Sequence, residues 1–200
     1  MKLRFALLLS VCSCTLSQEA PRPETMLILP EPRELRTDLS VTPLGAQKTV
    51  FSPAREISDS PGIEVYSKED FMRFGLSPET FAERSKKTAD RLLAQLKPDL
   101  IKSADGKVLY AVYRGERPIM GCLIIAPSLP KTFQEFFGNE IWVATPDRHS
   151  LYIFPAKPEA LEDFAPDLAA RYQADAYATS CEVFLIKTGQ PPQVVANFTE

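Results

Sequence analysis

Histidine is nearly missing from this chain of 200 residues, which contains only His149. A site built on two or more histidines of one chain is therefore excluded. Glycine is also scarce, at 8 residues, and no glycine-rich phosphate loop or Gly-x-Gly-x-x-Gly motif occurs. The Gly-x-Ser-x-Gly motif of many hydrolases and the His-Glu-x-x-His motif of zinc proteases are absent as well. We therefore expect no cofactor and no metal.

Only two cysteines, Cys122 and Cys181, lie beyond the first seventeen residues. Their spacing does not suit zinc, which takes closely spaced Cys or His pairs and four ligands in all. Both lie in apolar runs that look like strands, so we expect free, buried thiols. A disulfide between them is the alternative in an oxidising compartment.

The chain carries little excess charge, with 23 basic against 26 acidic residues and a net charge of −3. The densest basic group is Arg84, Lys86 and Lys87, which is expected to be a solvated helix face balanced by nearby acids. Nucleic acids and anionic lipid surfaces are bound by clustered Lys and Arg. We therefore expect no nucleic-acid partner.

Residues 1–17 have a basic start, an apolar run of ten and a small-residue end, which is the plan of a secretory signal peptide. The apolar run is too short to span a bilayer, which takes about 20 helical residues. The residues around Cys14 resemble a lipobox, so lipidation of Cys14 and ordinary cleavage after Ser17 both remain open, with an uncleaved leader as a third alternative. The expected location is the periplasm or cell envelope, with a lipid anchor as the only membrane attachment; otherwise the protein is secreted.

Proline is abundant, with 18 residues, and seven of them precede residue 62. Each proline lacks a backbone N–H and restricts the residue before it, which disfavours helix and sheet pairing. Residues 18–61 are therefore predicted to be a tether, partly disordered. Residues 26–29, Met-Leu-Ile-Leu, are interpreted either as a short edge strand or as a flexible apolar patch.

Residues 62–200 are predicted to form one α+β domain. Ser77 and Pro78 begin a helix that ends at Pro98. The pattern then predicts a hairpin of 108–113 with 119–125, a short helix at 130–137, a hairpin of 141–145 with 151–154, a helix kinked or split at Pro166, and a strand at 182–187. This order, αββαββαβ, favours a two-layer fold with a largely antiparallel sheet of about five strands and three helices.

Residues 62–189 resemble the YtpQ-like family of bacterial proteins of unknown function. The resemblance rests on the helix with paired leucines, on the strand Tyr-Ala-Val-Tyr at 110–113, and on the strand-turn-strand at 141–154. It implies an α+β domain and assigns no catalytic residues. The export leader and the proline-rich segment depart from that family.

Asp147 and His149 are the only candidates for catalysis, because an acid, an imidazole and a hydroxyl occur together there. Neighbouring residues of a tight turn point in different directions, however, so we expect Asp147 to stabilise the turn.

Phe136 and Trp142 belong to the richest aromatic patch, which is interpreted as core or, alternatively, as a binding groove. The expected function is a non-catalytic domain that binds another envelope protein; the alternative is a hydrolase with a site near Asp147 and His149.

Overall fold

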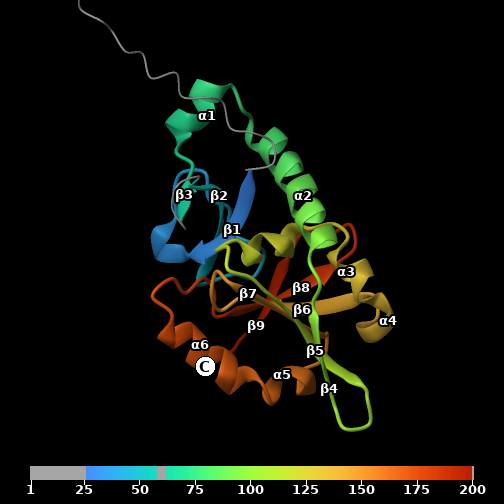
Figure 1. Ribbon diagram of the computed structural model, residues 1–200. Helices are drawn as coiled ribbons and strands as arrows, with labels where there is room; N and C mark the ends of the chain where they lie inside the picture. The colour runs from blue at the N-terminus through green and yellow to red at the C-terminus, as the bar shows by residue number, and fades with distance from the viewer. Residues whose placement is uncertain (1–25, 58–61, 200) are drawn as a thin grey trace, which may run out of the picture.

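The structure is a computed structural model, which describes residues 26–57 and 62–199 (Figure 1). The predicted leader and its Cys14 lie outside the described residues. The described strands form two sheets, one of six strands and one of three. All pairings between named strands are antiparallel, which confirms the predicted α+β class.

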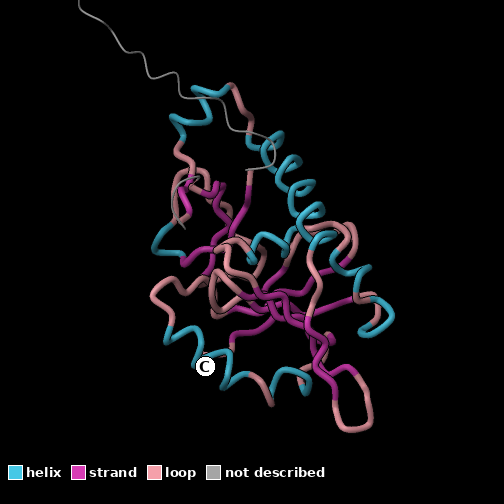
Figure 2. Tube along the Cα trace, viewed as in Figure 1, coloured by secondary structure: helices cyan, strands magenta, loops and turns pink. Residues whose placement is uncertain are grey.

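The large sheet occupies the centre of the molecule (Figure 2). Its strands, in spatial order, are β4 (Asp99–Lys102), β5 (Val108–Arg114), β7 (Ser150–Pro155), β6 (Glu140–Ala144), β8 (Glu182–Lys187) and β9 (Gln193–Asn197). The predicted hairpin of 141–145 with 151–154 is confirmed as β6 and β7. The predicted strand at 182–187 is confirmed as β8, which pairs with β6.

Both faces of the large sheet are buried. On β6, Ile141 and Val143 belong to one hydrophobic cluster, whereas Trp142 and Ala144 belong to another, because successive side chains of a strand point to opposite faces. The second face is covered by α5 (Glu159–Glu162) and α6 (Ala165–Ala174). The expected two-layer fold of five strands and three helices is therefore wrong in detail, because a sheet covered on both faces makes three layers.

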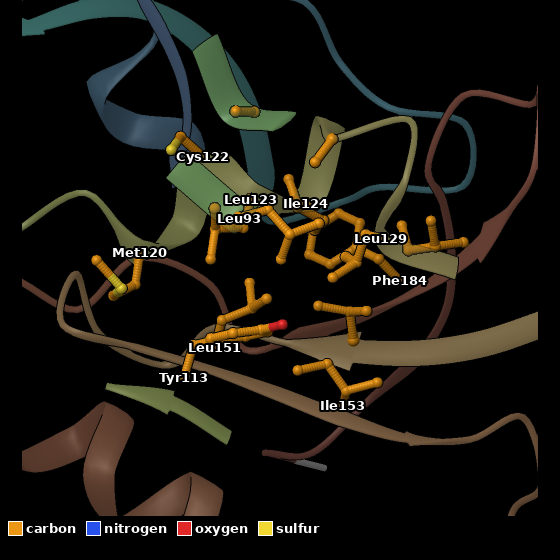
Figure 3. Close-up of a cluster of buried hydrophobic side chains, with 14 of the residues drawn as sticks. Leu93, Tyr113, Met120, Cys122, Leu123, Ile124, Leu129, Leu151, Ile153 and Phe184 are labelled. Atoms are coloured by element: carbon orange, nitrogen blue, oxygen red, sulfur yellow. The ribbon is translucent and has the colours of Figure 1, made fainter. Parts of the chain in front are cut away.

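The first face is covered by α2 (Pro78–Gln95), α3 (Leu129–Thr132), α4 (Gln134–Phe137) and a 3-10 helix, η3 (Met120–Ile125). Figure 3 shows Leu123 and Leu129 of this layer against Leu151, Ile153 and Phe184 of the sheet. The predicted hairpin of 108–113 with 119–125 is wrong, because η3 stands where the second strand was expected. An apolar run without alternation does not distinguish a buried strand from a buried helical segment.

The smaller sheet consists of β1 (Leu27–Pro32), β2 (Thr49–Glu56) and β3 (Ile63–Val65), with β2 in the middle. Leu27, Leu29 and Phe51 belong to the same cluster as the first face of the large sheet. Residues 26–57 are thus part of the folded body, and the predicted tether over 18–61 is wrong for them. Pro30 and Pro32 are compatible with this pairing because they lie on an edge strand, where a missing N–H is tolerated, whereas Pro53 lies on the middle strand, β2.

Hydrogen bonds and one ion pair join residues 26–57 to the large sheet, and we call this set the polar seam. Buried Thr49 and Ser180 share a hydroxyl hydrogen bond of 2.7 Å. The backbone N–H groups of Gln47 and Lys48 donate to the buried Glu182 carboxylate at 2.7 and 3.1 Å. The Arg148 guanidinium meets the buried Glu31 carboxylate at 2.8 Å. The seam gives partners to some of these buried polar groups, whose burial alone would lower stability, whereas Glu31 Oε1, Arg148 Nε and Glu182 Oε2 have no hydrogen-bond partner among the described residues.

The remaining helices follow local sequence signals. Ser77 caps α2 by accepting a hydrogen bond from the Thr80 N–H, as predicted for this helix. The helix predicted at 130–137 is present as α3 and α4, and the last helix is split as expected, with Pro166 in the first turn of α6. Elements that the sequence patterns did not predict are α1 (Lys68–Phe74), η2 (Arg33–Leu35), β2, β4 and β9, whereas β1 is the edge strand that was one of the two alternatives for residues 26–29.

Gly45 is expected to be the glycine most sensitive to substitution in the loop before β2. Its φ is +79°, and a Cβ there would lie 2.7 Å from the backbone oxygen of Val194 on β9. We expect Gly45→Ala to lower the free energy of unfolding by about 2–3 kcal/mol, because both the backbone and the contact with β9 are strained. Gly75→Ala is the control, with φ +61° and nothing within 4 Å of a Cβ, and is expected to cost about 1 kcal/mol. Urea unfolding of both variants tests this, and equal losses would contradict the packing of this loop on β9.

Candidate functional site

Asp147 lies in the turn between β6 and β7 and is buried. One of its carboxylate oxygens accepts from the backbone N–H of His149 at 2.8 Å, and the other accepts from the Ser150 hydroxyl at 2.7 Å. The carboxylate therefore bonds the backbone and hydroxyl of its own turn. This is the turn-stabilising role predicted for Asp147.

His149 is exposed, and its Nδ1 lies 3.1 Å from the backbone oxygen of Gly115. Its hydrogen-bonded contact with Asp147 is through the backbone N–H, not the ring. A catalytic dyad needs the carboxylate to orient the imidazole. The geometry thus gives no support to a hydrolase built on Asp147 and His149.

Nowhere in the described parts of the chain do three His, Cys, Asp or Glu side chains gather as metal ligands would.

The other predicted pair, Phe136 and Trp142, does not line one groove. Trp142 packs with the second face of the sheet. Phe136 is 48% exposed and contacts Phe137, which packs against the cluster of the first face. The sheet separates the two side chains, so the expected groove beside them is not formed. Phe136 and Trp142 are close in the sequence, but α4 and β6 present their aromatic residues to different layers. Closeness in the sequence therefore did not indicate closeness in the structure.

The cysteines also lie on different faces. Cys122 belongs to the cluster of the first face and Cys181 to that of the second, and both thiols are free and buried. The predicted free thiols are therefore confirmed. Burial raises the pKa of Cys122 to about 12, so its thiol stays protonated and is not a nucleophile near neutral pH.

The structure instead contains three neighbouring hollows, of which the first two are lined in part by α2, and we call this series the α2 groove. The first hollow has a volume of about 220 Å³ and lies between the small sheet and the start of α2. Its walls are apolar and include Leu39, Val41 and Phe51 on the sheet side and Phe71, Phe81 and Ala82 on the helix side. Val41 is 66% exposed, so one wall presents apolar surface to solvent.

The second and third hollows continue the groove toward α3 and the turn between β8 and β9. Ile125 lines both the first and the second hollow, which has a volume of about 280 Å³. Pro130 and Lys187 line both the second and the third hollow, of about 350 Å³. The shared residues show that the three hollows adjoin.

Lysines give the second and third hollows of the groove their charge. Lys86 and Lys187 are ion-paired with Glu83 at 2.8 Å and Glu140 at 2.6 Å. Lys131 has no carboxylate within 4 Å among residues 26–57 and 62–199. Amide side chains of Gln134, Asn139 and Gln190 line the same part. The α2 groove therefore has an apolar half and a polar half with a small excess of positive charge.

Sequence reasoning missed this groove because its walls come from segments far apart in the chain. Five of the ten residues that line the first hollow lie within 26–57, in the predicted tether. The one available signal was the apolar run Met26–Leu29, which was interpreted as an edge strand or a flexible patch. The place of Leu27–Leu29 in β1 depends on pairing with β2, which no local pattern of the sequence shows.

No helix in the described ranges is both long and apolar enough to cross a membrane. No family model, no curated protein and no solved structure matches this chain.

Proposed function

We propose that this protein is a non-catalytic binding domain of the bacterial cell envelope and that its α2 groove holds an extended segment of another envelope protein. The observation that carries the proposal is the groove itself, in which an apolar hollow continues into two polar ones. Domains that bind peptides commonly use a groove with pockets for successive side chains.

The sizes of the hollows support a peptide. Sites for drug-sized ligands usually enclose about 300–1,000 Å³ in one cavity with a few polar groups. Here the apolar hollow is smaller, at about 220 Å³, and is extended by neighbouring hollows with different chemistry. Such a series matches a chain of side chains better than one compact ligand. We expect apolar side chains of the partner in the first hollow and polar or acidic ones beside Lys131.

The exposed wall of the first hollow also favours binding. Burying apolar surface contributes about 25 cal/mol per Å², and a partner would cover Val41 and its neighbours. The geometry around Asp147 and His149 offers no comparable argument for hydrolysis. Export also belongs to the proposal and depends on the leader pattern of residues 1–17 alone, with lipidation of Cys14 and ordinary cleavage after Ser17 as its two alternatives. Membership of the YtpQ-like family likewise depends on the likeness of residues 62–189 alone.

A photocrosslinking amino acid at Val41 tests the proposal in cells of a bacterium that makes the protein. We expect one defined adduct from Val41→benzoylphenylalanine and from the same change at Lys131, because both positions line the groove. The matched control is Tyr177, which is as exposed as Val41, at 67%, and lies outside the groove.

A second variant separates groove binding from chance contact. Ala82→Trp places a large side chain in the first hollow and is expected to abolish the Val41 adduct while the protein stays folded by circular dichroism. Adducts of equal yield from Val41, Lys131 and Tyr177, or a Val41 adduct that survives Ala82→Trp, would show that the groove is not the binding site.

A further inference from the structure

A separate hollow lies on the second face of the large sheet, where β5 and β7 meet α6. It has a volume of about 60 Å³. Its walls are aromatic and its rim is charged, with Tyr110, Tyr152, Phe164, Arg114, Asp167 and Arg171 among its lining residues. Its volume leaves room for one small polar group, not for a nucleotide or a second polypeptide.

Two arginines converge on one aromatic ring in this hollow. The guanidinium carbons of Arg114 and Arg171 lie 6.0 and 5.8 Å from the centre of the Tyr152 ring. Cation–π contacts place each guanidinium near the same ring. An anion that reaches both guanidiniums would accept charge-assisted hydrogen bonds from each.

Neither arginine is saturated by a carboxylate of the described chain. Arg114 meets Asp99 only at 3.6 Å, and the two side chains are 47% and 66% exposed, so this pair contributes little to stability. Arg171 forms no ion pair within 4 Å among the described residues, although Asp167 lines the same hollow. The donors of Arg171 are therefore available to a ligand.

Tyr152 supplies a further donor. Its side chain is only 4% exposed, and its hydroxyl is buried without a hydrogen-bond partner among the described residues. An unpaired buried hydroxyl is costly, at about 1–3 kcal/mol, and a ligand oxygen would satisfy it. Tyr152 lines the same hollow as the two arginines.

Asp167 limits the charge of the ligand. The rim carries two arginines and one aspartate, and Asp99 lies 3.6 Å from Arg114, so the local charge disfavours a dianion such as a phosphate monoester more than a monoanion. We propose that this hollow binds the carboxylate group of a small organic acid or of a peptide end, with Arg114 and Arg171 as its charged donors and the Tyr152 hydroxyl as a third. The proposal is independent of the α2 groove, which lies on the other face of the sheet.

Titration of the ¹⁵N-labelled protein with benzoate tests the site by NMR. We expect saturable shifts of signals from Tyr152 and α6 with a dissociation constant on the order of 1 mM, typical of a fragment-sized ligand. Benzamide, which has the same shape and no charge, is expected to cause no saturable shift. N-acetyl-phenylalanine in a parallel titration distinguishes a peptide end from a free acid, and binding of either carboxylate supports the site.

Substitutions of single side chains test which residues donate hydrogen bonds to the bound carboxylate. Arg171→Gln and Arg114→Gln are each expected to weaken benzoate binding at least about tenfold, because each removes a charge-assisted hydrogen bond. Arg84→Gln, on exposed α2 surface, is the matched control and is expected to bind as the unaltered protein does. Tyr152→Phe keeps the ring and removes only the hydroxyl, and a severalfold loss is expected.

Asp167→Asn tests the charge argument directly. We expect it to strengthen the binding of inorganic phosphate more than that of benzoate, because it removes the charge that disfavours a dianion. No saturable shift with either carboxylate, or equal binding by Arg171→Gln and Arg84→Gln, would overturn the proposal.

Discussion

A chain that begins at residue 58, without β1 and β2, is expected not to fold. The deletion removes Leu27, Leu29 and Phe51 from the cluster shared with the large sheet. Each such side chain contributes roughly 1.5–3 kcal/mol by burial, and a whole domain is stable by only about 5–15 kcal/mol. The deletion also takes away the groups that pair with Arg148, Ser180 and Glu182 across the polar seam.

Circular dichroism during urea titration measures the outcome. We expect the shortened chain to show no cooperative transition, whereas a chain that begins at Gln18 unfolds in one step. Residues 62–200 were predicted from the sequence to be the complete domain. A cooperative transition of the shortened chain at the midpoint of the longer one would support that prediction and contradict the role of residues 26–57 described above.

Arg148→Met is expected to cost about 3–5 kcal/mol at neutral pH. Glu31 is 1% exposed, and Arg148 is the cation that faces it at 2.8 Å. Removing one partner of a buried ion pair leaves an uncompensated charge, which is far more costly than the pair itself. Urea unfolding at pH 7 gives the change in the free energy of unfolding.

The same variant is expected to recover stability as the pH falls. Burial raises the pKa of Glu31 above its ordinary value of 4.5, and Arg148 opposes that rise. A folded state with a raised carboxyl pKa binds the proton more tightly than the unfolded state does, so Glu31 lowers stability as the pH rises above about 4.5. Without Arg148 the pKa rises further. The loss caused by Arg148→Met should therefore be smaller at pH 5 than at pH 7.

The double variant Glu31→Gln with Arg148→Met serves as the control. It buries no charge, so we expect it to be more stable than Arg148→Met alone at pH 7 and to lose the added pH dependence. The same loss for the single and double variants, or a loss for Arg148→Met that does not change between pH 5 and pH 7, would show that the ion pair is not the cause.

Local signals predicted the elements that depend on local physics. Ser77 and Pro78 marked the start of α2, Pro166 the break before α6, and the alternating residues of 141–154 the hairpin of β6 and β7. The predictions failed where tertiary contacts determine the secondary structure. Residues 119–125 are apolar throughout, and such a run forms a strand or a buried helical segment according to what surrounds it.

The prolines of residues 26–57 misled the prediction for a related reason. Proline removes one donor from a ladder, but an edge strand does not need every donor. Pro30 and Pro32 lie on the edge strand β1, beside β2, and that position depends on pairing across seventeen or more residues. The same pairing builds one wall of the α2 groove. Because residues 26–57 were predicted to be a tether, the sequence did not predict this groove either. The turn role of Asp147 was predictable because its partners are two and three residues away.

Native-state hydrogen exchange of the β1 and β2 amides tests most directly whether residues 26–57 belong to the folded body and form a wall of the α2 groove. Exchange under conditions where reclosing is fast reports the free energy of each opening. We predict that the Leu29 and Val50 amides exchange with the same opening free energy as Val143 in β6, through unfolding of the whole domain. Exchange of Leu29 and Val50 through a separate opening, at a free energy near zero while Val143 stays protected, would contradict the account.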